Sequence, residues 1–350
     1  MPFSSGVLYG SQLTQLFDHL KQTKQALPAI NVTGTDTINA ALETAAKVKL
    51  PIIIQVSHGG AAFIAGKSLD NSSHQASIAG AASLALHVHN LAKLYQVPVI
   101  LHTDHCPEKN LGWIDGLLAV NQKFYSQNQR PLFSSHMLDL SELPLAQNIS
   151  ICSNYLTQFN QLNLFLELEL GVTGGQEDGI DNTHQSQDKL YTTPQDVSYA
   201  YEKLIKISPN FTIAASFGNV HGVYAPGNVT LKPDILSAIQ SYIQAKFKIP
   251  TSNPLNLVFH GGSGSEIDKI KQAVSYGVVK FNIDTDTQWA FWEGIKNYQT
   301  QNQPYLQSQL GNPEGKNKPN KDYYDPRKWL YSGQTQVIQR LKTAYQNLKI

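Results

Sequence analysis

Short apolar runs recur along the chain, with longer amphipathic segments between them. Eight of these runs are nearly continuous in Val, Ile, Leu and Phe, which is typical of parallel strands covered on both faces. They occupy residues 27–31, 51–57, 97–105, 131–140, 163–170, 211–221, 255–262 and 277–286. The segments between them place apolar residues at helical spacing, as in residues 35–49 and 193–208. We therefore predict an α/β fold, a (β/α)8 TIM barrel with extra N- and C-terminal helices and long active-site loops.

A doubly wound open sheet is the main alternative to the barrel, because it has the same alternation of strands and helices. No linker interrupts the chain, so we expect a single domain over residues 1–350. Two long segments, 171–194 and 310–328, match neither a strand nor a helix pattern. Loops of this length in a compact domain are usually functional or disordered. We expect both segments to be loops.

Polar and titratable residues stand at the carboxyl end of every predicted strand. In chain order they are Asn31, Ser57, Asp104 with His105, Asp139, Glu169, His221, His260, and Asn282 with Asp284. In a barrel all these strand ends open on one face, which is where the active sites of this fold lie. A chain that simply leaves a strand for solvent is also polar there. Histidines and carboxylates gathered at one face favour a reaction site.

Three of these residues suggest a metal site. His105, His221 and His260 each end a different strand. Catalytic zinc takes three protein ligands, commonly histidines, and leaves a fourth position for substrate or water. The alternative is that each histidine is simply packed in the core. We predict that the three bind one metal ion.

Other histidines and the cysteines are weaker candidates for metal ligands. His87 and His89 form an H-x-H pair, but they lie in a helical run, so their rings point to different sides. His102 shares a strand face with Asp104 and either supports the site or packs. Cys106 is expected to be a small packed residue.

Composition narrows the classes of function. The chain has 350 residues, of which 41% are hydrophobic, enough to bury a large core. Lys and Arg (27) nearly balance Asp and Glu (26), and no basic run occurs, so nucleic acid and anionic membrane are poor partners. No segment resembles a signal peptide or reaches the length of a membrane span. With two cysteines and no disulfide framework, we expect a cytoplasmic protein.

Several long motifs resemble those of class II, zinc-dependent fructose-1,6-bisphosphate aldolases. They read "HTDHC", "LFSSHMLDLSE", "LELELGVTGGQEDGID", "ASFGNVHGVYAPGNV", "FHGGSGS" and "VVKFNIDTDTQWA". The C-terminal "GNPEGKNKPNKDYYDPRKWL" resembles the dimeric class IIA branch, and the resemblance covers nearly the whole chain. It implies reversible cleavage of fructose 1,6-bisphosphate to dihydroxyacetone phosphate and glyceraldehyde 3-phosphate, a step of glycolysis and gluconeogenesis. It also implies a homodimer.

The resemblance also implies roles for single residues. His105, His221 and His260 match the ligands of the catalytic zinc. Asp139 and Glu169 match positions that can hold a second metal or support the site. The catalytic positions are matched by Asp104, the acid or base at the C4 oxygen, by Glu177, the loop carboxylate that handles the proton of dihydroxyacetone phosphate, and by Asn282.

The expected phosphate sites follow the last two strands. Backbone N–H groups of glycine-rich turns bind phosphate, and "HGGSGS" and "NIDT" occupy the usual phosphate corner of this fold. The resemblance places one phosphorylated triose against Gly222, Gly261, Gly262, Ser263, Asn282, Ile283, Asp284 and Thr285. It assigns Ser57 and Arg327 to the other phosphate and counts Asn31 among the substrate-binding residues. A monovalent cation near the phosphate is a further expectation from the resemblance.

The sequence departs from the family pattern at two positions and leaves alternatives open. Gln176 replaces the first residue of an acidic pair, and His58 stands where "SNGG" would have asparagine. Tagatose 1,6-bisphosphate, which differs only at C4, is an alternative substrate. A Schiff-base aldolase using Lys280 is a second alternative. A catalytically silent binding barrel is a third.

Overall fold

Eight parallel strands close into a barrel in the part of the chain that the computed structural model describes, residues 3–172, 174–177, 180–181, 191–221 and 230–349. In order around the barrel they are β2 (Leu27–Asn31), β3 (Ile52–Val56), β4 (Pro98–Thr103), β5 (Ser135–Leu138), β6 (Phe165–Leu170), β9 (Phe211–Ala215), β11 (Leu257–Phe259) and β12 (Val278–Asn282). The barrel closes because β5 pairs with both β6 and β4. The predicted (β/α)8 barrel is confirmed, and the open sheet is wrong.

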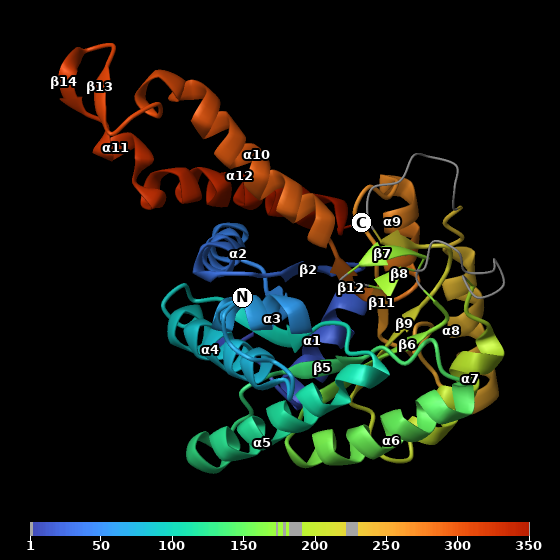
Figure 1. Ribbon diagram of the computed structural model, residues 1–350. Coiled ribbons are helices and arrows are strands. Elements are labelled where there is room, and N and C mark those ends of the chain that lie inside the picture. The colour runs from blue at the N-terminus through green and yellow to red at the C-terminus, as the bar shows by residue number, and fades with distance from the viewer. Residues whose placement is uncertain (1–2, 173, 178–179, 182–190, 222–229, 350) are drawn as a thin grey trace.

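Helices connect successive strands and surround the barrel (Figure 1). They are α2 (Thr35–Val48), α4 (Gln75–Ala92), α5 (Leu111–Asn128), α6 (Leu145–Gln161), α7 (Pro194–Leu204), α8 (Asp234–Phe247), α9 (Ile267–Ser275) and α10 (Asp284–Gln301). A short helix, α3 (His58–Ala65), precedes α4, and the described residues also include the 3-10 turns η1 (Glu108–Asn110) and η3 (Gln303–Tyr305). The extra terminal helices that the sequence predicts are α1 (Ser11–Gln22) and α12 (Pro326–Asn347).

The helix that follows β6 shows how the sequence fixes a helix start. The Thr193 side chain accepts a hydrogen bond from the backbone N–H of Asp196, and Pro194 occupies the first turn of α7. A threonine cap and a first-turn proline satisfy or remove N–H groups that have no partner within the helix. The predicted helical segment therefore begins where the sequence indicates, although it ends earlier, at Leu204.

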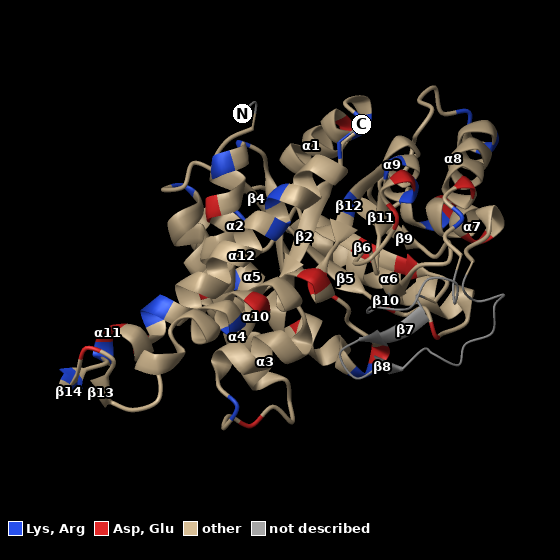
Figure 2. Ribbon diagram, turned by 90° about the horizontal axis from the view of Figure 1, so that it is seen from above, with Lys and Arg blue, Asp and Glu red and all other residues tan. Residues whose placement is uncertain are grey.

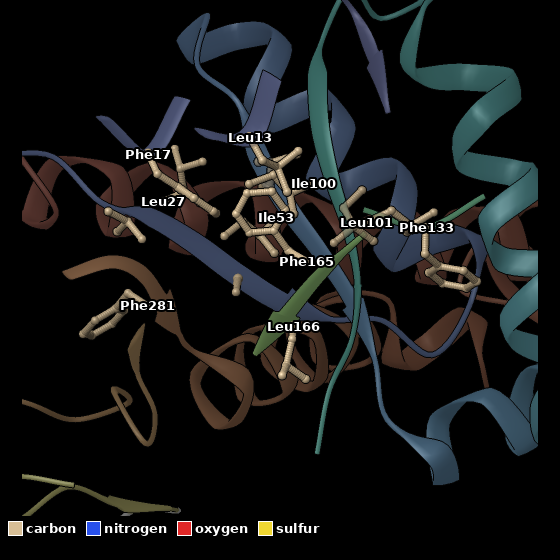
Figure 3. Packing of buried hydrophobic residues seen from close by; sticks show 14 of the residues in the cluster. Leu13, Phe17, Leu27, Ile53, Ile100, Leu101, Phe133, Phe165, Leu166 and Phe281 are labelled. Atoms are coloured by element: carbon tan, nitrogen blue, oxygen red, sulfur yellow. The ribbon is translucent and has the colours of Figure 1, made fainter. Parts of the chain in front are cut away.

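The amino-terminal end of the barrel is filled by α1. Leu13 and Phe17 of this helix lie beside Ile53, Ile100 and Phe165 of the strands (Figure 3). The rings of Phe17 and Phe165 meet edge to face with centroids 5.8 Å apart. Each such buried side chain contributes about 1.5–3 kcal/mol relative to exposure. Because α1 fills this end, the opposite end of the barrel, at the carboxyl ends of the strands, is the one that can hold an active site.

Most of the predicted strands are too long, as where residues 255–262 contain only β11, Leu257–Phe259. Strand β5 covers only part of residues 131–140, and residues 211–221 split into β9 and β10 (Val220–His221) around Gly218, which has φ 91°. Residues 277–286 divide between β12 and the start of α10 at Asp284. Apolar residues in loops next to a strand extend the pattern beyond the paired segment. The titratable residues of most strands consequently lie just beyond the strand ends.

The two long segments are not simply loops, so that prediction is wrong. The described part of residues 171–194 contains β7 (Gly174–Glu177) and β8 (Ile180–Asp181), which pair antiparallel. Residues 310–328 contain the hairpin β13 (Leu310–Asn312) and β14 (Gly315–Pro319), then α11 (Lys321–Tyr324) and the start of α12. The strand β1 (Gly6–Val7), which pairs with β4, was also not predicted. These strands are too short or too polar to show a periodic apolar pattern.

Helices α10 and α12 form an arm that extends from the barrel and carries β13, β14 and α11 at its tip (Figure 1). The two helices approach closely, since a Cβ at Gly294 would lie 2.4 Å from the carbonyl oxygen of Ser332. The Ser332 hydroxyl donates to the Gly294 carbonyl across this contact. Glycine at this position therefore allows the two helix backbones to pack.

Charges of both signs are interspersed on the outer helices. Helices α8 and α9, for example, each carry basic and acidic residues (Figure 2). Within the described residues, none of the helices combines the length and the apolar character that a membrane span requires.

Candidate active site

Asp104 lies at the centre of a buried polar network at the carboxyl end of the barrel. Its side chain is 1% exposed. Asn31 Nδ2 donates to one carboxylate oxygen at 3.0 Å, and Asn282 Nδ2 donates to the other at 3.4 Å. Lys280 Nζ lies 3.9 Å from the same carboxylate, and Gln55 donates to the side-chain oxygen of Asn31. Four adjacent strands, β2, β3, β4 and β12, thus fix one carboxylate.

His105, the next residue, turns toward a second group of carboxylates. Its backbone has φ 36°, in the left-handed region that residues other than glycine seldom adopt. Nδ1 of His105 lies 3.0 Å from Asp139 Oδ2 and 3.6 Å from Glu169 Oε2. The strained backbone therefore directs neighbouring side chains, Asp104 and His105, to different partners, as is common at functional sites.

His260 follows β11 and faces His105, with ring centroids 4.7 Å apart. Its Nε2 lies 2.9 Å from Glu167 Oε1, and its Nδ1 lies 3.4 Å from Glu169 Oε2. Burial alone would lower the pKa of His260, but the neighbouring Glu169 and Glu167 carboxylates outweigh it and raise the pKa to about 9. The carboxylates on both sides of the His260 ring thus favour its protonated form.

Glu167 is a residue that the sequence analysis missed. Lys280 Nζ donates to its Oε1 at 2.7 Å, and His102 Nε2 lies 3.6 Å from its Oε2. Burial would raise the pKa of Glu167, but Lys280 and His102 hold it well below its usual range. The motif "FLELEL" could have identified Glu167, because the alternation of side chains along a strand places it on the same face as Glu169.

Asp139 links the loop after β5 to His105. The Ser141 hydroxyl donates to the other oxygen of its carboxylate at 2.7 Å. Burial would raise the pKa of Asp139, but the hydrogen bonds and charge of His105, together with Ser141, hold the pKa below its usual range. Asp139 is thus an anionic acceptor that orients the imidazole of His105.

The residues expected around one phosphate gather after β11 and β12. Gly261 has φ 59°, in the left-handed region that glycine favours, and a Cβ at Gly262 would lie 2.4 Å from the Phe281 ring, so position 262 requires glycine. Ser263 Oγ accepts from the backbone N–H of Asp286, which joins this turn to the start of α10. That helix begins with Asp284 and Thr285, and its cap residue Ile283 contributes no side-chain hydrogen bond.

Ser57 caps the helix that follows β3. Its side chain is buried and accepts from the backbone N–H of Gly60 at 3.1 Å. His58, where the sequence departs from the family pattern, is the first residue of α3.

Four of the predicted site residues are not seen in the network around Asp104: three have no described side chain, and the fourth lies on the arm. His221 and Glu177 belong to β10 and β7, whose backbones pair with His221 opposite Gly175, but their side chains lie outside the described part. Gly222 lies outside the described residues altogether. Arg327 lies at the start of α12, on the arm, where its 87% exposed side chain is paired with Asp325.

The rival histidines have ordinary packing partners. His87 Nε2 lies 3.1 Å from Asn39 Oδ1, and His89 Nε2 lies 2.8 Å from the Leu132 carbonyl oxygen. Burial lowers the pKa of His89 to about 4. Cys106 is fully buried, and burial raises the pKa of its thiol. Their surroundings are those of packed side chains.

Comparisons with known proteins agree with this arrangement. The sequence model described as "Fructose-bisphosphate aldolase class-II" matches residues 11–350. The chain belongs to the class II fructose-bisphosphate aldolase family. It is 59% identical to fructose-bisphosphate aldolase class 2 of Escherichia coli (strain K12), over 98% of this chain and 96% of that protein. The crystal structure of fructose-bisphosphate aldolase from Campylobacter jejuni superimposes with a TM-score of 0.90 at 56% identity, over 99% of this chain and 96% of that one.

Class II aldolases are metal-dependent lyases, and the described side chains fit a metal ion. Three groups of donor atoms each lie within 4.8 Å of one another: Asp104, His105 and His260; His105, Asp139 and Glu169; and His102, Asp104 and Glu167. The third also contacts Lys280, whose positive charge opposes a second cation. The first two share His105 and combine imidazole with carboxylate, a donor set that suits divalent transition metals.

Proposed function

We propose that this chain is the aldolase that reversibly cleaves fructose 1,6-bisphosphate to dihydroxyacetone phosphate and glyceraldehyde 3-phosphate. The observation that carries the proposal is the meeting of His105, His260 and Asp104 within 4.8 Å at the mouth of the barrel. This arrangement combines ligands for a metal ion with a carboxylate that can move a proton. We also propose that the chain forms a single domain and that the enzyme acts in the cytoplasm.

In this proposal His105, His221 and His260 hold a zinc ion. When bound, the ion supplies a Lewis acid that polarises a substrate carbonyl. Asp139 orients the imidazole of His105 through the 3.0 Å contact, as carboxylates do for many metal-binding histidines. Glu169, which lies near both His105 and His260, supports the same pair and could hold a second metal ion together with Asp139.

Asp104 moves the proton at the C4 oxygen of the substrate. In cleavage its carboxylate accepts the proton of the C4 hydroxyl, and in condensation it returns that proton to the aldehyde oxygen. Asn31 and Asn282 donate to its two oxygens and keep the carboxylate aimed at one position. A held acid or base of this kind contributes roughly 10²–10⁴-fold in rate.

Glu177 exchanges the carbon-bound proton of dihydroxyacetone phosphate. Support comes from the backbone, since β7, which ends at Glu177, pairs with β10, which ends at His221. Glu177 thus belongs to a segment that runs beside a proposed metal ligand. Because Gln176 is an amide, it cannot share this role.

The substrate phosphates are assigned to two places. One is bound by the turn at Gly261, Gly262 and Ser263, by Gly222, and by the first turn of α10 with Asn282, Ile283, Asp284 and Thr285. N–H groups at a helix start bind anions, and the cap residue Ile283 makes no side-chain hydrogen bond to the first turn of α10, where the Asp286 N–H is already bonded to Ser263. Ser57 serves the other phosphate, and a monovalent cation beside the first is part of the proposal.

The proposal includes a homodimer. Trp289, Trp292 and Tyr331 of the arm are 57%, 54% and 56% exposed. Exposed large apolar residues of this kind are typical of protein interfaces. Arg327 lies in the first turn of α12, on the same arm, and we propose that it serves the phosphate assigned to Ser57 in the assembled dimer.

The experiment is aldol cleavage of fructose 1,6-bisphosphate, with dihydroxyacetone phosphate detected by a coupled assay and tagatose 1,6-bisphosphate as the competing substrate. A larger kcat/KM for the fructose compound is expected. A preference for tagatose 1,6-bisphosphate would change the substrate but not the reaction. Borohydride added with substrate should leave the enzyme active, because Lys280 is ion-paired with Glu167 and Asp104 rather than available for a Schiff base. Inactivation would contradict the metal mechanism.

A further inference from the structure

His58, the residue that follows Ser57, pairs its imidazole ring with that of His74. Nε2 of His58 lies 3.0 Å from Nδ1 of His74, and the rings stand nearly perpendicular, at 78°. His58 is the first residue of α3 and His74 is the cap residue of α4, so the pair joins the starts of two adjacent helices. Both side chains are half-buried. None of the roles assigned above uses them.

The surroundings of His58 hold its ring and its backbone. The ring packs edge to face on the buried Trp113, with centroids 5.4 Å apart. The carbonyl of His58 accepts from Ser77 Oγ at 3.0 Å, and Ser77 is joined to Asn71 by two further hydrogen bonds. The turn that carries Ser57 is therefore anchored to the start of α4 through His58.

The geometry limits how many protons the pair can hold. A hydrogen bond between two imidazole nitrogens needs one N–H and one lone pair. One added proton can go to the outer nitrogen of the ring that donates, which keeps the hydrogen bond and makes it charge-assisted. A second added proton would place two N–H groups face to face. While its hydrogen bond persists, the pair carries either no charge or one positive charge.

In the free protein the surroundings oppose that charge. Burial, His74 on the segment before α4, and Lys109 in η1 all lower the pKa of His58. The first turn of α3 adds a partial positive charge from its N–H groups. An anion bound beside Ser57 would act in the opposite direction, because a nearby opposite charge favours the protonated imidazole.

We propose that the His58–His74 pair takes up one proton when a substrate phosphate binds at Ser57, so that phosphate binding strengthens as the pH falls. The inference rests on the proposed function, which assigns Ser57 to a phosphate. Proton and phosphate strengthen each other's binding by the same factor, because their coupling is reciprocal. His58 is thus a positioning residue: it holds the Ser57 turn and adds a charge to it only when the anion is present.

The test compares the wild type with the double variant His58→Asn, His74→Gln, which keeps hydrogen-bonding groups but cannot titrate. KM for fructose 1,6-bisphosphate and the inhibition constant of sulfate, a dianion that does not titrate near neutral pH, are measured between about pH 8 and about pH 6. The ratio of wild-type to variant values should fall by roughly threefold to tenfold across this range, as expected for one charge near a dianion. Taking the ratio cancels the ionisation of the substrate itself. His87→Asn, on α4 but bonded to Asn39, is the matched control and should follow the wild type.

The outcomes separate this inference from the proposed function. If the wild type cleaves fructose 1,6-bisphosphate but the ratio stays constant with pH, the proton-linked pair is wrong and the aldolase stands. If the wild type does not cleave the substrate at any pH, the proposed function fails. Should the double variant not fold, calorimetry of sulfate binding to the wild type in two buffers of different ionisation enthalpy measures proton uptake directly. Uptake that grows toward one proton as the pH falls supports the pair, and no uptake overturns it.

Discussion

Nε2 of His260 lies 2.9 Å from Oε1 of Glu167, and both side chains are buried. This contact fixes which imidazole nitrogen is turned away from the metal site, since Nδ1 is left on the side of Glu169. Lys280 donates to the same oxygen of Glu167 and compensates its charge. Glu167 therefore sets the orientation of His260 without being assigned to the metal itself.

Replacing Glu167 with glutamine should weaken metal binding. The amide keeps the shape but loses the charge that holds both Lys280 and His260, and comparable changes behind metal ligands cost roughly 10–100-fold in metal affinity. Zinc affinity is measured by competition with a chromophoric chelator. Glu293→Gln, at an exposed position of α10, is the control and should bind zinc as the wild type does. Equal affinity in Glu167→Gln and wild type would show that Glu167 does not position His260.

Asp104→Asn should lower turnover by roughly 10²–10⁴-fold in both directions while the metal stays bound. Asparagine cannot carry the proton at the C4 oxygen, although it can still contact Asn31 and Asn282. Initial rates of cleavage and condensation are compared with the zinc content of the purified variant. A loss of zinc would mean that Asp104 is a ligand or holds the site together, and would contradict its role in proton transfer.

Glu177→Ala should slow proton exchange at the carbon of dihydroxyacetone phosphate by roughly 10²–10⁴-fold. This exchange requires only one substrate, so it isolates the step assigned to Glu177 from cleavage itself. Hydrogen–deuterium exchange followed by NMR measures it. The neighbouring Gln176→Ala is the matched control and should retain exchange within a few-fold of the wild type. Near-normal exchange in Glu177→Ala would remove this residue from the mechanism.

The buried His136 should make the protein sensitive to acid. Its ring lies between Thr103 Oγ1 at 2.8 Å and Asn121 Nδ2 at 3.1 Å, and burial, with a smaller effect of His102, lowers its pKa to about 3. In the unfolded chain this histidine has a pKa of about 6.5. As the pH falls below that pKa, the unfolded chain gains a proton that the folded chain does not take up. Between about pH 6.5 and about pH 4.5 this group alone should cost about 2 kcal/mol in the free energy of unfolding.

Urea unfolding of the wild type and of His136→Gln over this range measures that cost. The variant is expected to be less stable at neutral pH, because it changes a buried hydrogen-bonded side chain, but to lose less stability on acidification. Parallel losses in the two proteins would contradict the assignment of a neutral, buried His136.

The barrel was predictable because its strands carry a strong, regular signal. Runs such as "PIIIQVS" and "NLFLELEL" have no competing pattern, and the next helix along the chain, α3 or α7, starts at a side-chain cap, Ser57 or Thr193. The hairpin of β13 and β14 has no such signal, since β14 reads "GKNKP" and is largely exposed. Its pairing is set by local backbone hydrogen bonds rather than by burial, so periodicity could not reveal it.

The site was predictable where residues stand at strand ends and less so elsewhere. Asn31, Asp104 and Asn282 were expected at one face because parallel strands end together, and they share hydrogen bonds. The role of Glu167 depends on a partner 113 residues away in the chain, Lys280, and no spacing in the sequence reveals that contact. The His58–His74 pair likewise arises from the approach of two helix starts.

The most direct test of the account is cleavage of fructose 1,6-bisphosphate before and after treatment with EDTA, followed by added zinc. The account predicts that removal of the metal abolishes activity and that zinc restores it, because His105, His221 and His260 are assigned to the ion on which the reaction depends. Metal analysis of the treated protein confirms that the ion has been removed. Full activity in protein shown to be free of metal would contradict the central claim.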